Sequence, residues 1–314
     1  MNQVIVVGAG NWGKNLVKNF SELGALAGVA EMNPDLRAAI SESYPGIITY
    51  SDYQQVLATD IPAVVLATPA PTHYQLAMAA LEGGKDVFVE KPMTLRREEA
   101  IALAKYADQQ SRILMVGHLL LYQPAIAWMR GYLASGKAGK VYHVATQRVK
   151  LGRVRREENV WWSFAPHDVS VVLDLLGNPT VTQVQAQGQA ILQPQIEDNV
   201  YVDLQFEGGQ TGHVHCSWYW PELKRSTTVI AEREMLVYDE VSQQVTVYRK
   251  GVHEDLSNRD GGSWSPDVTA SEPLKLECEH FLHCVATRQQ PLSDGWNGVA
   301  VVEILEKAQE SMRF

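Results

Sequence analysis

Residues 4–13 read VIVVGAGNWG and give the clearest indication of the fold. Its first four residues are apolar and β-branched, which predicts a buried strand. Glycines at positions 8, 10 and 13 complete a GxGxxG pattern, and Leu16, Phe20 and Leu23 follow at helical spacing. Glycines allow a tight turn and a close approach of the backbone to a pyrophosphate, and the helix N-terminus supplies free N–H groups. The stretch therefore predicts a strand, turn and helix that bind a dinucleotide.

Beyond this turn, short apolar strands alternate with amphipathic helices. The expected strands lie at residues 26–30, 63–67, 86–90 and 113–116, and the expected helices at 73–81 and 96–109. Strands and helices that alternate in this way imply an α/β fold with a doubly wound, mostly parallel sheet. We assign this Rossmann-type, dinucleotide-binding domain to residues 1–117.

After Gly117 the pattern changes to long stretches that alternate apolar and polar residues. A helix at 124–135 is followed by expected strands at 141–150, 199–206, 211–218 and 226–231. Residues 252–272 are rich in Gly, Ser, Asp and Pro and are expected to form a loop, and a helix is expected near the end of the chain. This pattern predicts an α+β domain with a large, mostly antiparallel open sheet at residues 118–314, for substrate binding and oligomerisation.

Composition excludes several classes of protein. The 314 residues carry a formal charge of −9, so nothing indicates general binding to nucleic acid or to a membrane. The N-terminus does not resemble a signal peptide, and no apolar run is long enough to span a membrane. Three cysteines, Cys216, Cys278 and Cys284, are too few for a disulfide framework, so a reducing cytoplasm is the expected location.

Glu31 ends the second expected strand, 21 positions after Gly10. A carboxylate at this place accepts hydrogen bonds from the adenosine ribose and repels a 2′-phosphate, which favours NAD over NADP. Arg37 could stack on the adenine or pair with a phosphate.

Two further motifs follow expected strands: ATPAPTH at residues 67–73 and FVEKP at residues 88–92. With the glycine-rich turn, they resemble the Gfo/Idh/MocA family of oxidoreductases over essentially the whole chain. The resemblance implies that Lys91 reaches the substrate hydroxyl beside the nicotinamide and that the bond before Pro92 is cis. The cofactor contacts that we expect fall on Gly8, Gly10, Asn11, Trp12, Gly13, Glu31, Arg37, Thr68, Pro69, Thr72, His73, Glu90 and Lys91.

The same family carries an aspartate and, four residues later, a histidine in its second domain. His167 matches the histidine, but Ser163 stands where the aspartate is expected. We therefore predict that His167 is the general base, acting with Lys91 alone or with the neighbouring Asp168. A helix cap or a core histidine is the alternative for His167.

Substrate contacts are expected from two further segments. By resemblance, Tyr122 and Gln123 lie where the family binds substrate, although Tyr122 could equally serve packing. The second segment is a basic cluster that ends just before the expected catalytic stretch. Guanidinium groups suit phosphate or carboxylate, while a solvated basic loop or a network of ion pairs is the alternative. The expected substrate contacts in this part of the chain are Arg148, Lys150, Arg153, Arg155, Arg156, Asn159, His167 and Asp168.

Within the family, these features look most like nucleotide-sugar 3-dehydrogenases. The resemblance implies NAD-dependent oxidation of the C3 hydroxyl of UDP-N-acetylglucosamine, with an aminotransferase as pathway partner, in bacterial lipid A or surface-polysaccharide synthesis. The uronic acid of that sugar, a free sugar or polyol, and a regulator without turnover are the alternatives. The second-domain sheet suggests a homodimer or homotetramer.

No metal is expected, because the possible ligands are not grouped as a complete catalytic set. The side chains considered were Glu279, His280, His283 and Cys284, and separately His213 and His215.

Overall fold

A computed structural model describes residues 3–312. The chain divides into two compact units: one comprises the residues up to Leu119 together with Glu272–Val302, and the other comprises Leu120–Ser271 with the residues from Glu303 onward. The sequence predicted a single boundary after Gly117, with residues 272–302 in the second domain. In the structure these residues belong to the first unit.

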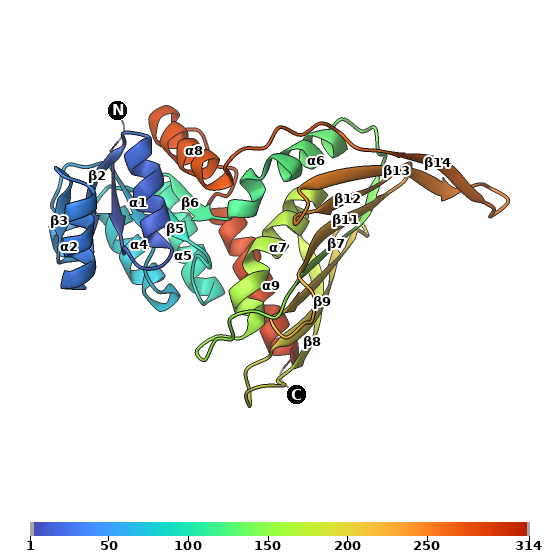
Figure 1. The fold of residues 1–314 in the computed structure, drawn as a ribbon, viewed down its shortest axis with the longest axis horizontal. Helices are drawn as coiled ribbons and strands as arrows, with labels where there is room; N and C mark the ends of the chain where they lie inside the picture. Colours follow the sequence, from blue (N-terminus) through green and yellow to red (C-terminus); the bar gives the residue numbers. More distant parts are fainter. Residues whose placement is uncertain (1–2, 313–314) are drawn as a thin grey trace. The chain divides into compact units, whose positions relative to one another are not determined.

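The first unit is built on a parallel sheet of six strands in the order β3-β2-β1-β4-β5-β6. This is the doubly wound order of dinucleotide-binding folds, so the predicted fold class is confirmed. Helix α1 packs on β1 and β2, and α4 packs on β4 and β5 (Figure 1). The strands are β1 (Val4–Val7), β2 (Leu26–Ala30), β3 (Ile48–Tyr50), β4 (Ala63–Leu66), β5 (Asp86–Glu90) and β6 (Leu114–Gly117). The helices are α1 (Gly13–Glu22), α2 (Pro34–Ser43), α3 (Tyr53–Leu57), η1 (Ala70–Thr72), α4 (His73–Glu82), α5 (Arg97–Gln109) and α8 (Pro273–Thr287).

Local sequence explains why these elements begin and end where they do. Every residue of β1 is at most 5% exposed, as expected for a central strand that helices cover. Helix α1 begins directly after the glycine-rich turn. Helix α2 begins after Asn33, whose side chain accepts from the N–H groups of Asp35 and Leu36, and Pro34 occupies its first turn.

The second unit holds a sheet of eight strands in the order β14-β13-β12-β11-β7-β10-β9-β8. All neighbours pair antiparallel except β7 and β10, which confirms the predicted, mostly antiparallel sheet. The strands are β7 (Val141–Val149), β8 (Val181–Gln189), β9 (Asn199–Phe206), β10 (Thr211–Ser217), β11 (Lys224–Ala231), β12 (Met235–Asp239), β13 (Gln244–Val252) and β14 (Asn258–Trp264). The remaining helices are η2 (Leu119–Tyr122), α6 (Pro124–Ala134), α7 (Val160–Leu176) and α9 (Gly295–Met312); η2 and α9 run from one unit into the other.

The prediction of a loop over residues 252–272 was wrong for its first half. Strand β14 lies there and pairs antiparallel with β13, Tyr248 opposite Ser263. Asn258–Ser263 are all exposed. An exposed edge strand needs no alternation of apolar residues, so its composition resembles that of a loop.

Helix α7 covers one face of the second sheet, where it packs on β7, β9 and β10. Trp161 in α7 donates from its indole nitrogen to the carbonyl oxygen of Leu305, at 3.1 Å, which joins α7 to the last turns of α9. Over residues 3–312 no helix is long and apolar enough to cross a membrane.

Candidate active site

The glycine-rich turn has the backbone geometry that a pyrophosphate requires. Gly8 has a φ of +92°, and a Cβ there would lie 2.8 Å from the carbonyl oxygen of Ala67. A Cβ on Gly13 would overlap the carbonyl oxygen of Gly8, so the helix can start this close to the strand only with glycine. At Gly10 nothing lies within 4 Å of the Cβ position, which leaves the backbone open for the close approach of a ligand. The turn therefore fits a dinucleotide.

Glu31 lies at the end of β2 and faces this turn. Its carboxylate accepts from the N–H of Ala9 at 2.7 Å and from the N–H of Asn33 at 2.9 Å. The Arg37 guanidinium donates to the carbonyl oxygens of Glu31 at 2.7 Å and Met32 at 3.2 Å. The acidic residue thus stands beside the glycine-rich turn, where the sequence placed it, and Arg37 supports the local backbone.

In the segment after β4, His73 has a structural role and not the cofactor contact that we expected. His73 is 1% exposed, and its ring nitrogens lie 2.8 Å from the carbonyl oxygen of Pro92 and 2.9 Å from that of Thr68. Burial lowers the pKa of His73, although hydrogen bonding to the two carbonyl oxygens opposes the shift. His73 therefore joins the two segments that flank the site, and we leave it out of the proposed cofactor contacts. Thr72 is exposed and donates from its hydroxyl to Thr68 and to the carbonyl oxygen of Pro69.

The FVEKP motif follows β5, and the Lys91–Pro92 bond is cis, as the resemblance implied. Glu90 is 7% exposed and accepts from the indole N–H of Trp12 at 2.5 Å. The backbone N–H of Lys91 also donates to the Glu90 carboxylate, at 3.3 Å. Burial raises the pKa of Glu90 to about 7, against the opposing effects of Trp12 and Lys91. Glu90 thus connects the glycine-rich turn with the lysine-bearing motif.

In the second unit, helix α7 carries His167 and, one turn earlier, Ser163. Asn159 caps this helix, since its side-chain oxygen accepts from the N–H of Trp162 at 3.1 Å. The Asn159 amide group donates to Glu197 and Gln309, at 2.6 and 2.7 Å. Both ends of the Asn159 side chain are thus engaged, so its role is to start the helix and we leave it out of the substrate contacts.

Arg148 and Asp168 form a buried ion-pair network. The Arg148 guanidinium donates to Asp168 at 2.6 Å and to Glu240 at 2.9 Å, and Arg225 also donates to Glu240, at 3.0 Å. Side chains of Arg148 and Asp168 are only 12% and 4% exposed. Burial raises the pKa of Asp168, although Arg148 opposes the shift. The pKa of Glu240 is lowered, because the effects of Arg148 and Arg225 outweigh that of burial. The expected substrate contacts of Arg148 and Asp168, and the use of Asp168 to orient His167, are therefore withdrawn.

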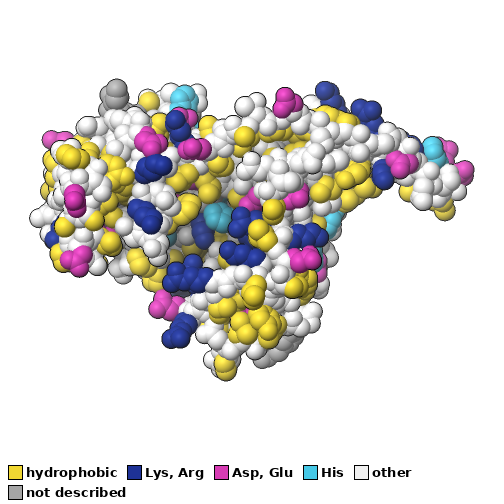
Figure 2. All heavy atoms as spheres, viewed as in Figure 1, with side chains coloured by type: hydrophobic (Ala, Val, Ile, Leu, Met, Phe, Trp, Pro, Cys, Tyr) yellow, Lys and Arg dark blue, Asp and Glu magenta, His cyan; other side chains and the backbone are white. Residues whose placement is uncertain are grey.

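The rest of the basic cluster is different. Arg153, Arg155 and Arg156 are exposed in the loop before α7, where Figure 2 shows dark-blue side chains. Arg155 pairs with Glu158 at 3.8 Å, and the Lys150 ammonium lies 5.9 Å from the centre of the Phe164 ring in α7. These cations are accessible to an anionic ligand.

Two residues at the start of the second unit remain candidates. Tyr122 is 7% exposed, and Gln123 lies at the N-cap of α6 with its side-chain oxygen buried and without a hydrogen-bond partner. An unpaired buried carbonyl suits contact with a ligand donor.

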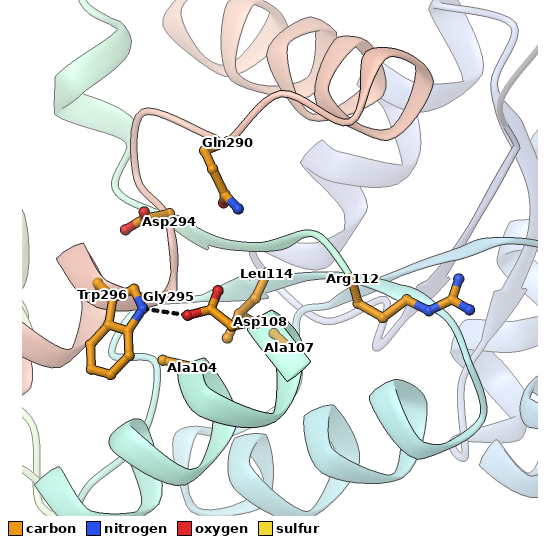
Figure 3. Close-up of a pocket in the computed structure, with 9 residues that line it drawn as sticks. All are labelled: Ala104, Ala107, Asp108, Arg112, Leu114, Gln290, Asp294, Gly295 and Trp296. Atoms are coloured by element: carbon orange, nitrogen blue, oxygen red, sulfur yellow. Dashed lines mark hydrogen bonds between the residues drawn. The ribbon is translucent and has the colours of Figure 1, made fainter. Parts of the chain in front are cut away.

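Neither a metal site nor the pocket described next alters the choice of cofactor and substrate residues. Among residues 3–312 no group of three or more His, Cys, Asp or Glu side chains could hold a metal ion. One surface pocket lies beside Asp108, Leu114 and Trp296, and the Trp296 indole donates to Asp108 at 2.7 Å (Figure 3). Leu114 begins β6, whereas the glycine-rich turn follows the end of β1. The pocket therefore lies at the opposite edge of the parallel sheet from the cofactor site.

Two family models match the chain. Residues 2–118 match the oxidoreductase family with an NAD-binding Rossmann fold, GFO/IDH/MocA, and residues 126–237 match the GFO/IDH/MocA C-terminal domain. The chain belongs to the Gfo/Idh/MocA family. This assignment confirms the resemblance drawn from the motifs, and with it an NAD-dependent oxidoreductase.

Two curated relatives in the family illustrate its chemistry. UDP-N-acetylglucosamine 3-dehydrogenase of Acidithiobacillus ferrooxidans is 24% identical, over 95% of this chain and 93% of the relative. The scyllo-inositol 2-dehydrogenase (NAD(+)) of Bacillus subtilis is 27% identical, over 85% of this chain and 81% of the relative. Both are dehydrogenases, one of a nucleotide sugar and one of a polyol.

Solved structures of the family share the fold. The A. ferrooxidans enzyme, GnnA, superimposes with a TM-score of 0.87 at 24% identity, covering 98% of this chain and 97% of GnnA. The WlbA dehydrogenase of Bordetella pertussis, solved with NADH and UDP-GlcNAcA, gives a TM-score of 0.82 at 21% identity, covering 99% of this chain and 96% of WlbA.

Proposed function

We propose that this Gfo/Idh/MocA protein oxidises the C3 hydroxyl of UDP-N-acetylglucosamine to the 3-keto sugar, with NAD as oxidant. The observation that carries the proposal is the exposed basic loop, Arg153, Arg155 and Arg156, which leads directly into the helix of His167. In a chain of net charge −9, such a loop favours a substrate with its own negative charge, such as a sugar diphosphate. The similarity to UDP-N-acetylglucosamine 3-dehydrogenase supports the same choice.

The two proposed catalytic residues have complementary tasks. The hydride leaves C3 for the nicotinamide, and the hydroxyl proton passes to the imidazole of His167. The Lys91 ammonium stabilises the negative charge that develops on the oxygen. Ser163, one turn before His167 in α7, stands where the family carries an aspartate.

The uronic acid of the same nucleotide sugar is the second candidate. WlbA was solved with UDP-GlcNAcA, and the basic loop offers more than one cation. An extra arginine beyond those needed for the diphosphate would bind the C6 carboxylate.

The free face of the second sheet supports a homodimer or homotetramer. Residues on this face are mostly polar but uncharged. Gln147, Asn199 and Thr228 are examples, and the register of strand pairing places all three on the same side of the sheet. The buried His215 stacks on Tyr201 at 4.2 Å and meets the edge of Trp220 at 5.1 Å. We propose that a second copy of the chain covers this face, and sedimentation at several concentrations tests it.

The deciding experiment is NADH formation by the purified protein with NAD and, in turn, UDP-N-acetylglucosamine, its uronic acid, glucose and myo-inositol. Each reaction is repeated with a keto-acid acceptor or with the partner aminotransferase, and the product is identified by mass spectrometry. Oxidation of UDP-N-acetylglucosamine that is lost in Lys91→Ala and His167→Ala is the expected result. Oxidation of an uncharged polyol alone contradicts the substrate proposal.

A further inference from the structure

A second carboxylate lies buried behind the FVEKP motif. Glu277, in α8, is fully buried, and neither of its side-chain oxygens has a hydrogen-bond partner. Its neighbours Glu279, His280 and His283 are of residue types that bind metals, and the sequence singles them out more readily than Glu277. No pattern in the sequence distinguishes this buried glutamate from the exposed Glu279 two positions later.

Packing of α8 on β5 brings Glu277 towards Glu90. The rings of Phe88 in β5 and Phe281 in α8 meet edge to face, with centroids 5.6 Å apart. Glu90 lies two residues after Phe88, on the same face of the strand, and Glu277 lies one helical turn before Phe281. The two carboxyl groups therefore approach each other across the contact that the aromatic pair makes, and they interact electrostatically.

Several titratable groups surround this pair of carboxyl groups. The charge of Glu90 acts on Glu277, and Glu90 also lies close to Lys91. Cys278, on the same helix, is fully buried, and the buried residues of α1, which packs on α8, include no titratable side chain. After β6 comes His118, 1% exposed and without a hydrogen-bond partner on either ring nitrogen.

These surroundings set the protonation states. Burial, and then the charge of Glu90, raise the pKa of Glu277 well above its usual range, so Glu277 keeps its proton at neutral pH. Burial raises the pKa of Glu90 only to about 7, because Trp12 and Lys91 stabilise its charged form. Burial lowers the pKa of His118 to about 3, so this imidazole is neutral. Burial also lowers the pKa of His73 and raises that of the Cys278 thiol.

We propose that Glu90, backed by the buried Glu277, links the oxidation state of the bound nicotinamide cofactor to proton binding. Glu90 stands at the carboxyl end of β5, the edge of the sheet at which ligands bind in this fold, and it bonds to Trp12 of the glycine-rich turn. NAD binding favours the ionised form of Glu90 and releases protons to solvent, whereas NADH binding favours the protonated form and takes protons up.

The physical basis is the charge of the nicotinamide ring, which is positive in NAD and neutral in NADH. A cation near a carboxyl group favours the ionised form, and a neutral ring that excludes water favours the protonated form. By linkage, raising the pH through the pKa of Glu90 then strengthens NAD binding relative to NADH, by up to about tenfold per pH unit. Since the two cofactors share their adenosine and phosphates, the comparison isolates the ring.

Calorimetry of the two binary complexes tests the proposal without any sugar, so its outcome is independent of the proposed substrate. NAD and NADH are titrated into the full chain at pH 7 in phosphate and in Tris, whose ionisation enthalpies differ. The dependence of the heat on the buffer counts the protons exchanged. We expect a release of up to roughly half a proton with NAD and an uptake of up to roughly half a proton with NADH, because Glu90 is half protonated near its pKa.

Matched variants identify the titrating group. Glu90→Gln should make the two proton counts equal, while Glu277→Gln, a neutral replacement for a protonated carboxyl, should leave them different. Trp12→Phe removes a donor to the ionised form and should move the midpoint of the pH dependence upward, which keeps the test available if Glu90→Gln does not fold. Equal counts in the wild-type protein, or a difference that survives in folded Glu90→Gln, overturn the proposal. If the proton counts for NAD and NADH become equal in folded Glu277→Gln, the titrating group is not Glu90.

Discussion

Replacement of Arg148 by alanine should destabilise the second unit severely. The guanidinium holds Asp168 and Glu240, whose side chains are 4% and 12% exposed. Removing one partner from a buried ion pair costs about 3–5 kcal/mol, because the carboxylates left behind are buried and uncompensated. Arg225 still reaches Glu240, at 3.0 Å, so most of the cost should come from Asp168.

The assay is urea unfolding at neutral pH, followed by circular dichroism, with Arg156→Ala as the control. Arg156 belongs to the same basic cluster but is exposed. Its removal should change the free energy of unfolding by less than about 0.5 kcal/mol, while it weakens binding of the anionic substrate. The two arginines thus separate a structural role from a binding role.

The loss of unfolding free energy caused by Arg148→Ala, called the deficit below, should depend on pH. Burial already raises the pKa of Asp168 in the native protein, and loss of Arg148 removes the largest opposing effect. The unpaired carboxyl should therefore bind a proton as the pH falls, and the deficit should shrink in acid. An unfolding free energy within about 1 kcal/mol of the wild type, or a deficit that grows on acidification, would refute the reasoning.

Three other changes have defined outcomes. Glu31→Ala should weaken NAD binding about tenfold, as expected for the loss of one hydrogen bond to a charged group, and should reduce the preference for NAD over NADP, measured by fluorescence titration; an unchanged preference contradicts the role of Glu31. Gly13→Ala should abolish NAD binding, because the added Cβ overlaps the carbonyl oxygen of Gly8, and wild-type affinity in the same titration would show that the turn can adjust. Burial lowers the pKa of His118 from 6.5 to about 3, so its neutral ring stabilises the fold above pH 6.5, and this contribution is lost as the pH falls towards 3. His118→Gln should therefore lose less stability between pH 6.5 and 5 than the wild type, by up to about 1.4 kcal/mol per pH unit, and a parallel loss in both proteins would exclude His118.

Local sequence was sufficient for the glycine-rich turn and for its acidic partner. The spacing from Gly10 to Glu31 is set by one strand, one helix and the next strand, and parallel pairing of β1 with β2 brings Glu31 to the turn. The doubly wound parallel sheet followed from the same alternation of strands and helices. The edge strand β3 was not predicted, and the order of the strands came from the structure.

Residues whose role depends on distant partners could not be assigned in this way. Arg148 and Arg156 look alike in the sequence, but pairing of β7 with β11 and packing of α7 surround only Arg148 with carboxylates. Similarly, nothing near Glu277 indicates that its helix returns to the first unit and packs on β5.

The fold class, the NAD-binding turn and the family thus followed from the sequence, because each depends on short-range periodicity or on motifs of fixed spacing. Which charged side chains are buried against one another, and which remain exposed to a ligand, emerged only in the folded chain. The reason is that burial and the pKa of a charged group depend on atoms brought together from distant parts of the chain, as Glu277 and Glu90 are.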